Sequence, residues 1–479
     1  EWDEQARPAA IRHLDEVGQL LYACETTADA AGRQITALET RRLADGSCQE
    51  RRRQWQYDAW GRLRREESDA PGTKQMHYVQ DFYYDLAGNR LADYRQYADG
   101  DYIIRQRSFD VNDRLLTETS ETAAQTIQRD FVWDDNGSLT AVYRQGRQEP
   151  ERRFIWDCEN KLTAVIIVEH DEQGRKIGER RADYTYDAEG LLSSQTTTVT
   201  AANGGVSRQE IRFRSVGLTP DAVPQLLETV ESRDGVIADQ RFCLWSGSLL
   251  AMYSSRLGRL RCLTDNAGNV RGFLGQGDTA ANLPADYDSW GQPLSTGAVP
   301  EPCLGFAGEW QDPTTGLVYL RSRFYWPEVG IFISRDQHPG DLEQPLSLHR
   351  YAYCRNDPVN HRDPTGGFGM VLVQAAMMSG GGSPMLRFWR GGIEYLAGMF
   401  ADPGMTLVFA AQPREHDQAT VIVHGLEHHA PGYADDFIGL LKERGVEHDY
   451  YQFIWSGCQM AEFLLPPNPI HHGIALASL

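Results

Sequence analysis

The chain has 479 residues, too many for one ordinary domain, and its 41% hydrophobic and 24% charged residues are typical of a globular protein rather than a disordered one. A formal net charge of −20 argues against a nucleic-acid-binding surface spread over the whole chain, because phosphate binding needs a basic footprint. The eight cysteines include no CxxC pair, which excludes the usual spacings of zinc and redox sites.

Residues 1–300 repeat one short motif: an aromatic or apolar residue, Asp, two variable residues, Gly and, soon after, an apolar residue. The complete motif has its aspartate at Asp15, Asp29, Asp58, Asp85, Asp134, Asp171, Asp187, Asp265 and Asp288. Asp at the first and Gly at the fourth position indicate a type I turn, in which Asp can bond the backbone two residues on. In two further copies Asp113 or Asn160 replaces the glycine, and these residue types tolerate positive φ best. Each motif therefore predicts the tip of a β-hairpin.

Between the tips lie alternating polar and apolar runs such as DYIIRQRSF, the pattern of strands with one wet face. Successive tips from Asp58 to Asp187 are 23 to 30 residues apart, a solenoid-like period. One repeat cannot bury its own apolar face, so neighbouring repeats have to stack. The pattern predicts a mostly β fold, a stacked antiparallel sheet. Residues 204–286 are less regular, and we expect more of the same sheet with long loops there.

Residues 301–367 form a distinct block, in which closely spaced aromatic residues stand between Pro and Gly, as in short twisted strands joined by tight turns. Its runs GLVYLRSRFYWPEVGIFISRD and HRYAYCRNDPVNHRDPTG closely resemble the RHS-associated core of the RHS/YD-repeat proteins, which include polymorphic toxins and the C components of insecticidal toxin complexes. The repeats before this block extend the resemblance over most of the chain. The resemblance implies that the YD-repeat sheet winds into a hollow shell, a cocoon, that encloses a C-terminal polypeptide.

The candidate catalytic residues are Arg335 and Asp336 in ISRD and Asp363 in RDPTGG. Two carboxylates held close together cannot both ionise cheaply, so one keeps a proton and the pair can act as general base and general acid on a peptide bond and a water. The equivalent aspartates of the RHS family cut the chain just past the DPxG motif, which implies self-cleavage between Gly367 and Phe368. Glycine stands at position 367 where the family usually has leucine, and the loop between the two aspartates carries the insert GDLEQPLS.

Residues 368–412 are expected to be an apolar, Gly-rich linker without an uninterrupted span of membrane length. The strand-like runs TLVFAA, ATVIVHG and YYQFIWSG, with the amphipathic run DDFIGLLKERG before the last, predict a small α/β segment, which we assign to residues 413–479. ATVIVHG resembles the start of α/β-hydrolases and of the lipase-like tails of RHS toxins, which implies an oxyanion loop at His424, Gly425 and Leu426.

The tail lacks the rest of a hydrolase site. No G-x-S-x-G motif follows the expected oxyanion loop, and no Asp and His follow in triad order, so we expect no hydrolase activity from this tail. The histidines near this loop match no metal-ligand spacing such as HExxH. We expect neither a metal nor another cofactor.

The resemblance implies an RHS-repeat toxin fragment that encloses a C-terminal effector polypeptide and releases it by autoproteolysis, in interbacterial or insecticidal delivery. The implied partners are the chain's own C-terminal toxin polypeptide inside the shell, a cognate immunity protein, and a secretion or translocation apparatus; the shell is not expected to bind nucleic acid. The implied location is the bacterial cytoplasm before export, followed by secretion or delivery to a target cell through a contractile machine such as a type VI secretion system.

Other interpretations stay open. Asp336 and Asp363 could merely cap turns beside proline and glycine, and Arg335 could be an ordinary surface arginine. The chain would then be a structural or cell-surface YD-repeat binding protein that does not cut itself. A third alternative is a lipase-like effector whose catalytic triad lies in a further segment. Because the first residue is Glu1, we expect the chain to be a piece of a longer protein.

Overall fold

The computed structural model describes most of residues 9–367 and six short strands beyond them. Within residues 9–367 it leaves out 16–17, 44–45, 71–73, 172, 217–222, 247, 276–279, 283–285, 295–302 and 343. The chain divides into two compact units, residues 1–216 with 223–376, and residues 217–222 with 377–479. In the part of the chain that is described, no helix is long and apolar enough to cross a membrane.

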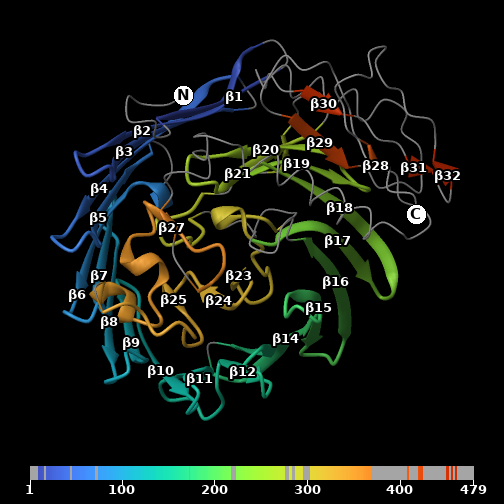
Figure 1. The fold of residues 1–479 in the computed structure, drawn as a ribbon. Coiled ribbons are helices and arrows are strands. Elements are labelled where there is room, and N and C mark those ends of the chain that lie inside the picture. The colour runs from blue at the N-terminus through green and yellow to red at the C-terminus, as the bar shows by residue number, and fades with distance from the viewer. Residues whose placement is uncertain are drawn as a thin grey trace. The chain divides into compact units, whose positions relative to one another are not determined.

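The first unit is built on one sheet of 22 strands (Figure 1). Each strand pairs antiparallel with the strands before and after it in the chain, so the sheet is a continuous meander. The strands are β1 (Ala10–Leu14), β2 (Leu20–Ala28), β3 (Gln34–Arg42), β4 (Cys48–Tyr57), β5 (Leu63–Asp69), β6 (Tyr78–Tyr84), β7 (Arg90–Tyr97), β8 (Tyr102–Phe109), β9 (Leu115–Thr122), β10 (Thr126–Trp133), β11 (Leu139–Arg144), β12 (Arg152–Trp156), β13 (Leu162–His170), β14 (Lys176–Tyr186), β15 (Leu192–Ala201), β16 (Val206–Val216), β17 (Gln225–Arg233), β18 (Val236–Ser246), β19 (Ser248–Ser254), β20 (Gly258–Thr264), β21 (Val270–Leu274) and β22 (Ala280–Asn282). The predicted antiparallel sheet is confirmed, and β16 to β22 continue it through the region that the sequence pattern left less regular.

The repeated Asp-x-x-Gly motifs form the hairpin tips, as predicted. At Asp58 the Gly61 amide donates to the Asp58 carbonyl oxygen at 3.0 Å, and the Asp58 carboxylate accepts the amides two and four residues on at 2.9 Å. Gly61 lies at φ 84°, which makes the loop a type I turn followed by a G1 bulge. Asp113 and Asn160 each take the glycine's place at φ 62°. The turn depends on a residue that tolerates positive φ, and these two substitutions preserve it.

The aromatic residue before the motif's aspartate joins one repeat to the previous one. Trp133 donates its indole N–H to the Leu115 carbonyl oxygen at 2.7 Å. The same kind of contact, also 2.7 Å long, joins Tyr84 to Leu63, Trp156 to Leu139 and Tyr186 to Leu162. Trp245, which is followed by serine rather than by a motif aspartate, contacts Leu226 in the same way. Tyr and Trp combine a large apolar ring with a polar donor, so they can bury the ring and still bond the neighbouring repeat. These contacts explain why the motif prefers Tyr or Trp.

Residues 303–367 lie inside the curve of the sheet (Figure 1, yellow to orange). Their elements are η3 (Phe306–Gly308), β23 (Val318–Leu320), β24 (Arg323–Trp326), β25 (Ile331–Phe332), η4 (Pro345–Leu348), η5 (Tyr353–Asn356) and β26 (His361–Arg362). Strands β23 to β25 form a small antiparallel sheet. Trp326 is buried, with its ring centre 6.2 Å from that of Phe131 in β10 and 6.1 Å from that of Phe154 in β12. The block therefore shares one apolar core with the repeats around it.

Charged side chains between the sheet and the inner block are paired. Arg107 in β8 contacts Asp93 in β7 at 2.6 Å, and Arg129 in β10 contacts Glu328 of the inner block at 2.7 Å. Burial by itself raises the pKa of Glu328, but Arg129 and Arg152 outweigh burial and lower it to about 2. A charge taken out of water needs such a partner, so the pairing of Glu328 with Arg129 helps to fix how the inner block sits against β10.

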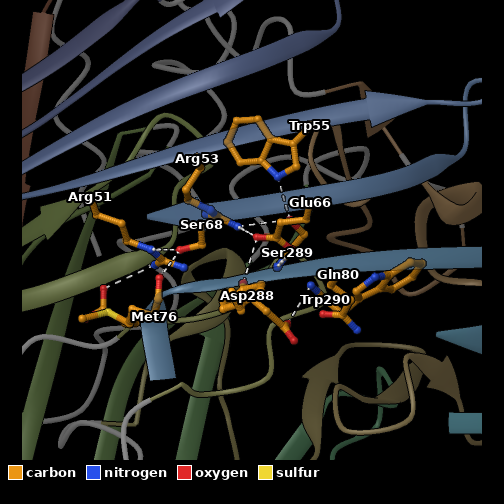
Figure 2. Close-up of polar contacts among 12 residues, drawn as sticks. Arg51, Arg53, Trp55, Glu66, Ser68, Met76, Gln80, Asp288, Ser289 and Trp290 are labelled. Carbon is orange, nitrogen blue, oxygen red and sulfur yellow. Dashed lines mark hydrogen bonds and ion pairs between the residues drawn. The ribbon is translucent and has the colours of Figure 1, made fainter. Parts of the chain in front are cut away.

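The motif at Asp288 is an exception among the repeats. It forms the predicted turn, but its flanking residues make only an isolated bridge and are not strands of the large sheet. The turn is instead buried against β4, β5 and β7: Trp55 donates to the Ser289 hydroxyl at 2.9 Å, and the Ser289 amide donates to Glu66 at 3.2 Å (Figure 2). Arg95 contacts the Asp288 carboxylate at 2.5 Å. The expectation of a hairpin tip in the sheet is therefore wrong for this copy, because the buried polar groups of β4 to β7 hold it inside.

The two ends of the sheet meet through side chains. Among the described strands, β1 pairs only with β2 and β22 only with β21, so backbone pairing leaves the sheet open. His13 in β1 lies 2.9 Å from the Thr264 carbonyl oxygen in β20, and Arg271 in β21 donates to Glu39 in β3 at 3.2 Å. Strands β1 and β3 near one end of the sheet are thus bridged to β20 and β21 near the other end by polar side chains rather than by a ladder.

The second unit contains short strands in the segment predicted to be α/β. They are β28 (Leu407–Val408), β29 (Ala419–Val423), β30 (Asp449–Tyr451), β31 (Trp455–Ser456) and β32 (Gln459–Met460), whereas β27 (Met370–Val371) belongs to the first unit and pairs with β26. Strand β29 pairs antiparallel with β28 and parallel with β30. A parallel pair needs a crossover connection, as a strand–helix–strand unit has. The helix predicted between β29 and β30 lies outside the described residues.

Candidate functional site

Asp336 lies in the inner block shortly after β25, beside the hairpin tip of the sheet that contains Gly137. The Arg335 amide donates to the Gly137 carbonyl oxygen at 3.1 Å, and the next amide, that of Asp336, donates to the Arg350 carbonyl oxygen at 3.1 Å. The Asp336 carboxylate accepts the His338 amide at 2.9 Å. Its position is therefore set by backbone contacts on both sides, and its side chain is 18% exposed.

Asp363 follows β26 and opens the DPTG turn. Its Oδ1 accepts the Gly366 amide at 2.8 Å and the Thr365 hydroxyl at 3.2 Å. The side chain is 3% exposed. Both candidate aspartates thus cap the turns that they begin, which is the arrangement that the turn-capping alternative predicts.

The two carboxylates also meet at one buried guanidinium, that of Arg323 at the start of β24. Its Nη2 lies 2.7 Å from Asp336 Oδ2 and 3.7 Å from Asp363 Oδ2. Burial lowers the pKa of Arg323, and the two carboxylates oppose that effect. A positive charge between two carboxylates offsets their mutual repulsion, so the pair can be held close in a buried place.

The arginine that contacts both carboxylates is Arg323, which no sequence motif singled out, rather than the candidate Arg335. Successive side chains of an extended segment point to opposite sides, so Arg335 and Asp336 cannot face the same way. Arg335 is exposed beside the Gly137 turn. The signal for Arg323 was present in the sequence: it stands directly before three aromatic residues of a predicted strand, and a charge buried among aromatic residues needs a partner.

The segment that leads to the expected cleavage site lies along β24. The Ser322 amide and hydroxyl donate to the Thr365 carbonyl oxygen at 3.1 and 2.8 Å. Arg323 Nε donates to the Gly366 carbonyl oxygen. The backbone just before the expected cut is therefore bound to the same strand that supplies the guanidinium.

The two glycines of this segment have different surroundings. Gly366 lies at φ 71°, and a β-carbon there would overlap the Leu320 carbonyl oxygen. A β-carbon at Gly367 would meet nothing closer than 3.8 Å and would lie 3.9 Å from Asp336 Oδ1. Position 366 therefore requires glycine, whereas position 367 has room for a side chain and faces Asp336.

Some of the expected site residues cannot be placed. Phe368, on the far side of the expected cut, lies outside the described residues, as do His424, Gly425 and Leu426 of the expected oxyanion loop. Within the described ranges, no group of three or more His, Cys, Asp or Glu side chains is arranged to hold a metal ion. The described site consists of two carboxylates, one guanidinium and the Gly366–Gly367 backbone, a set that suits acid–base chemistry on a peptide bond.

Comparison with known proteins agrees with this architecture. Residues 245–359 match the family model of the Teneurin YD-shell. The tRNA3(Ser)-specific nuclease WapA of Bacillus spizizenii is 28% identical over 312 residues, which are 62% of this chain and 11% of that protein. The toxin protein Tse5 of Pseudomonas aeruginosa is 33% identical over 118 residues, which are 24% of this chain and 8% of Tse5.

The solved TcdB2-TccC3-Cdc42 complex aligns with 74% of this chain and 19% of its own chain, at 15% identity and a TM-score of 0.48. The chain spans about a tenth of the length of the two curated relatives. The repeat hairpins, the matched shell segment and these relatives support an RHS/YD-repeat shell of the kind found in polymorphic toxins.

Proposed function

We propose that this chain forms part of a toxin shell that encloses a C-terminal polypeptide and releases it by one self-cleavage, between Gly367 and Phe368. The observation that carries the proposal is the convergence of Asp336 and Asp363 on Arg323, directly beside the Gly366–Gly367 backbone. Turn caps alone do not require two carboxylates from distant parts of the chain to share one buried cation.

In the proposed reaction a water molecule attacks the carbonyl carbon of Gly367. Asp336 faces Gly367 and is the more exposed of the two aspartates, so we assign it the role of general base that takes a proton from the water. Asp363, in its protonated form, gives a proton to the amide nitrogen of Phe368. The C–N bond breaks, which leaves a carboxyl group on Gly367 and an amine on Phe368.

The biological setting follows from the relatives. WapA and Tse5 are named as a nuclease and a toxin, which supports a toxin-delivery role for a chain with the same kind of shell. The proposed partners are the chain's own C-terminal polypeptide, a cognate immunity protein and a secretion or translocation apparatus. The proposed route is export from the bacterial cytoplasm to a target cell through a contractile secretion system.

The test is the intact mass of the purified chain under denaturing conditions, beside Asp336→Asn and Asp363→Asn. Two fragments that divide at Gly367, and a single full-length mass in both variants, are the expected result. Asp341→Asn is the matched control, because it changes an exposed aspartate in the loop between the two and should still cut. A single full-length mass in the unchanged chain would overturn self-cleavage and favour a YD-repeat binding protein.

A further inference from the structure

Residues 333–335 of the inner block lie along residues 137–139 at the tip of the β10–β11 hairpin. Two backbone hydrogen bonds of 2.9 and 3.1 Å and an antiparallel bridge join the two segments. Asp336 follows directly, and its carboxylate caps the next turn at the His338 amide. The backbone that carries Asp336 therefore extends the sheet's own hydrogen bonding, and its position depends on where this hairpin lies.

Tyr351 contacts the same hairpin. Its hydroxyl donates to the Gly137 carbonyl oxygen at 3.1 Å, and its ring meets the Trp133 ring edge-on, with 5.0 Å between the ring centres. Tyr351 is buried, so its hydroxyl has little room to move. A β-carbon at Gly137 would lie 2.5 Å from the Tyr351 hydroxyl oxygen and 3.1 Å from the Arg335 β-carbon. This tip and the inner block thus fit together without room for a methyl group.

A different hairpin tip, that of β6–β7, holds the segment that leads to Asp363. Asn356 Nδ2 donates to the Gly88 carbonyl oxygen at 2.8 Å, and His349 Nε2 lies 3.0 Å from Asn89 Oδ1. Both inner-block side chains are buried at these contacts. The two candidate aspartates are therefore held by two tips of the sheet, with the β8–β9 hairpin between them.

The inner block adopts an unfavourable backbone at the second of these tips. Cys354, Arg355 and Asn356 lie at φ 48°, 53° and 64°, in the left-handed region that disfavours residues other than glycine. Three such residues in succession persist only where the surrounding structure holds them. The bond from Asn356 to the Gly88 carbonyl oxygen is one such restraint, so the turn before Asp363 depends on the sheet.

We propose that the tips of β6–β7 and β10–β11 position the two aspartates for self-cleavage, so that the chain cuts itself only after the sheet has curved around the inner block (Figure 1). The inference rests on the proposed cleavage between Gly367 and Phe368. The contacts of Tyr351 and Asn356 with these tips span 214 and 268 residues, so they form only when the sheet has folded. A misplacement of about 1 Å at a reacting bond can lower the rate about 100-fold.

Alanine at Gly137, compared with alanine at Gly61, tests the first tip. Both glycines close an Asp-x-x-Gly turn, at φ 83° and 84°, so the backbone cost of alanine is the same at each. A β-carbon at Gly61 meets nothing within 4 Å, whereas at Gly137 it meets Tyr351. The cleavage rate is read from denaturing gels of the full chain made by cell-free synthesis, and intact mass identifies the cut. We expect Gly137→Ala to lower the rate about 100-fold and Gly61→Ala to leave it unchanged.

Glycine at Asn356 tests the second tip. Glycine adopts positive φ readily, so Asn356→Gly removes the bond to the Gly88 carbonyl oxygen and still permits the left-handed turn. We expect this variant to cut about 10- to 100-fold more slowly. Arg355→Gly is the matched control, because it places glycine at the neighbouring left-handed position and keeps the bond to Gly88; it should cut at the unchanged rate.

Two measurements distinguish positioning from a loss of folded protein. Tyr351→Phe removes the hydroxyl that alanine at position 137 would strike, so adding it to Gly137→Ala should restore part of the lost rate. Sucrose favours the folded state, and thermal unfolding reports the folded fraction. A variant that is folded in sucrose and still cuts slowly supports the inference, whereas a return to the unchanged rate in sucrose overturns it.

The outcomes separate this inference from the proposed function. If the unchanged chain stays whole, both are wrong. If it cuts, and folded Gly137→Ala and Asn356→Gly cut at its rate, the inference is wrong and the cleavage proposal stands. A slow rate in only one of the two overturns the role of the other tip. Should Gly137→Ala not fold, Tyr351→Phe decides for that tip: a slower rate in the folded variant supports the inference, and an unchanged rate overturns it.

Discussion

Replacing Gly366 with alanine is expected to block self-cleavage, whereas the same change at Gly367 is not. Gly366 lies at φ 71°, a conformation that costs other L-residues about 1–2 kcal/mol. Its new β-carbon would also overlap the Leu320 carbonyl oxygen and lie 3.0 Å from the Arg323 amide nitrogen, backbone atoms that cannot rotate away. The turn has to move, and a shift of about 1 Å at the cut can lower the rate about 100-fold.

The assay is the rate at which the two fragments appear on a denaturing gel after synthesis. Gly367→Ala is the matched control, because it adds the same methyl group where nothing lies closer than 3.8 Å, and it should cut at nearly the unchanged rate. Thermal unfolding of both variants shows whether the shell is intact. Equal cleavage rates in the two variants, both folded, would refute the reasoning that the Gly366 turn positions the cut.

Three further predictions concern stability. Burial raises the pKa of Glu328 but Arg129 outweighs it, so the pKa falls from 4.5 to about 2; the folded state gains stability above pH 4.5 that it loses as the pH falls toward 2. Glu328→Gln should therefore lose on the order of 1–3 kcal/mol at neutral pH and match the unchanged chain in acid, as urea unfolding at several pH values can show. Trp133→Phe removes the bond to Leu115 and should cost about 1 kcal/mol in the same assay; an unchanged midpoint would contradict the proposed link between repeats. Trp326→Ala empties part of the core and should cost about 3–5 kcal/mol, so a variant as stable as the unchanged chain would contradict that packing.

Most of the repeat architecture could be predicted from the sequence, because its determinants are local. A type I turn with a left-handed fourth residue needs only Asp and Gly at a fixed spacing, and the substitutes Asp113 and Asn160 obey the same steric rule. Alternation of polar and apolar residues is also local, and it indicated strands between the tips. The motif at Asp288 shows the limit: its turn was predictable, but its place inside the sheet depends on partners such as Trp55 and Glu66, which lie far away in the chain.

In the candidate site, too, some features follow from local sequence and others depend on the tertiary structure. The sequence by itself determined which aspartates begin turns, since Asp336 and Asp363 stand in local motifs that accept nearby amides. Only the tertiary structure decided which arginine joins them, because Arg323 reaches both carboxylates across strands that no local pattern pairs. It also decided that Gly366 has no room for a side chain while Gly367 does. Local turn chemistry acts over four or five residues, whereas a buried charge takes its partners from whatever the fold packs around it.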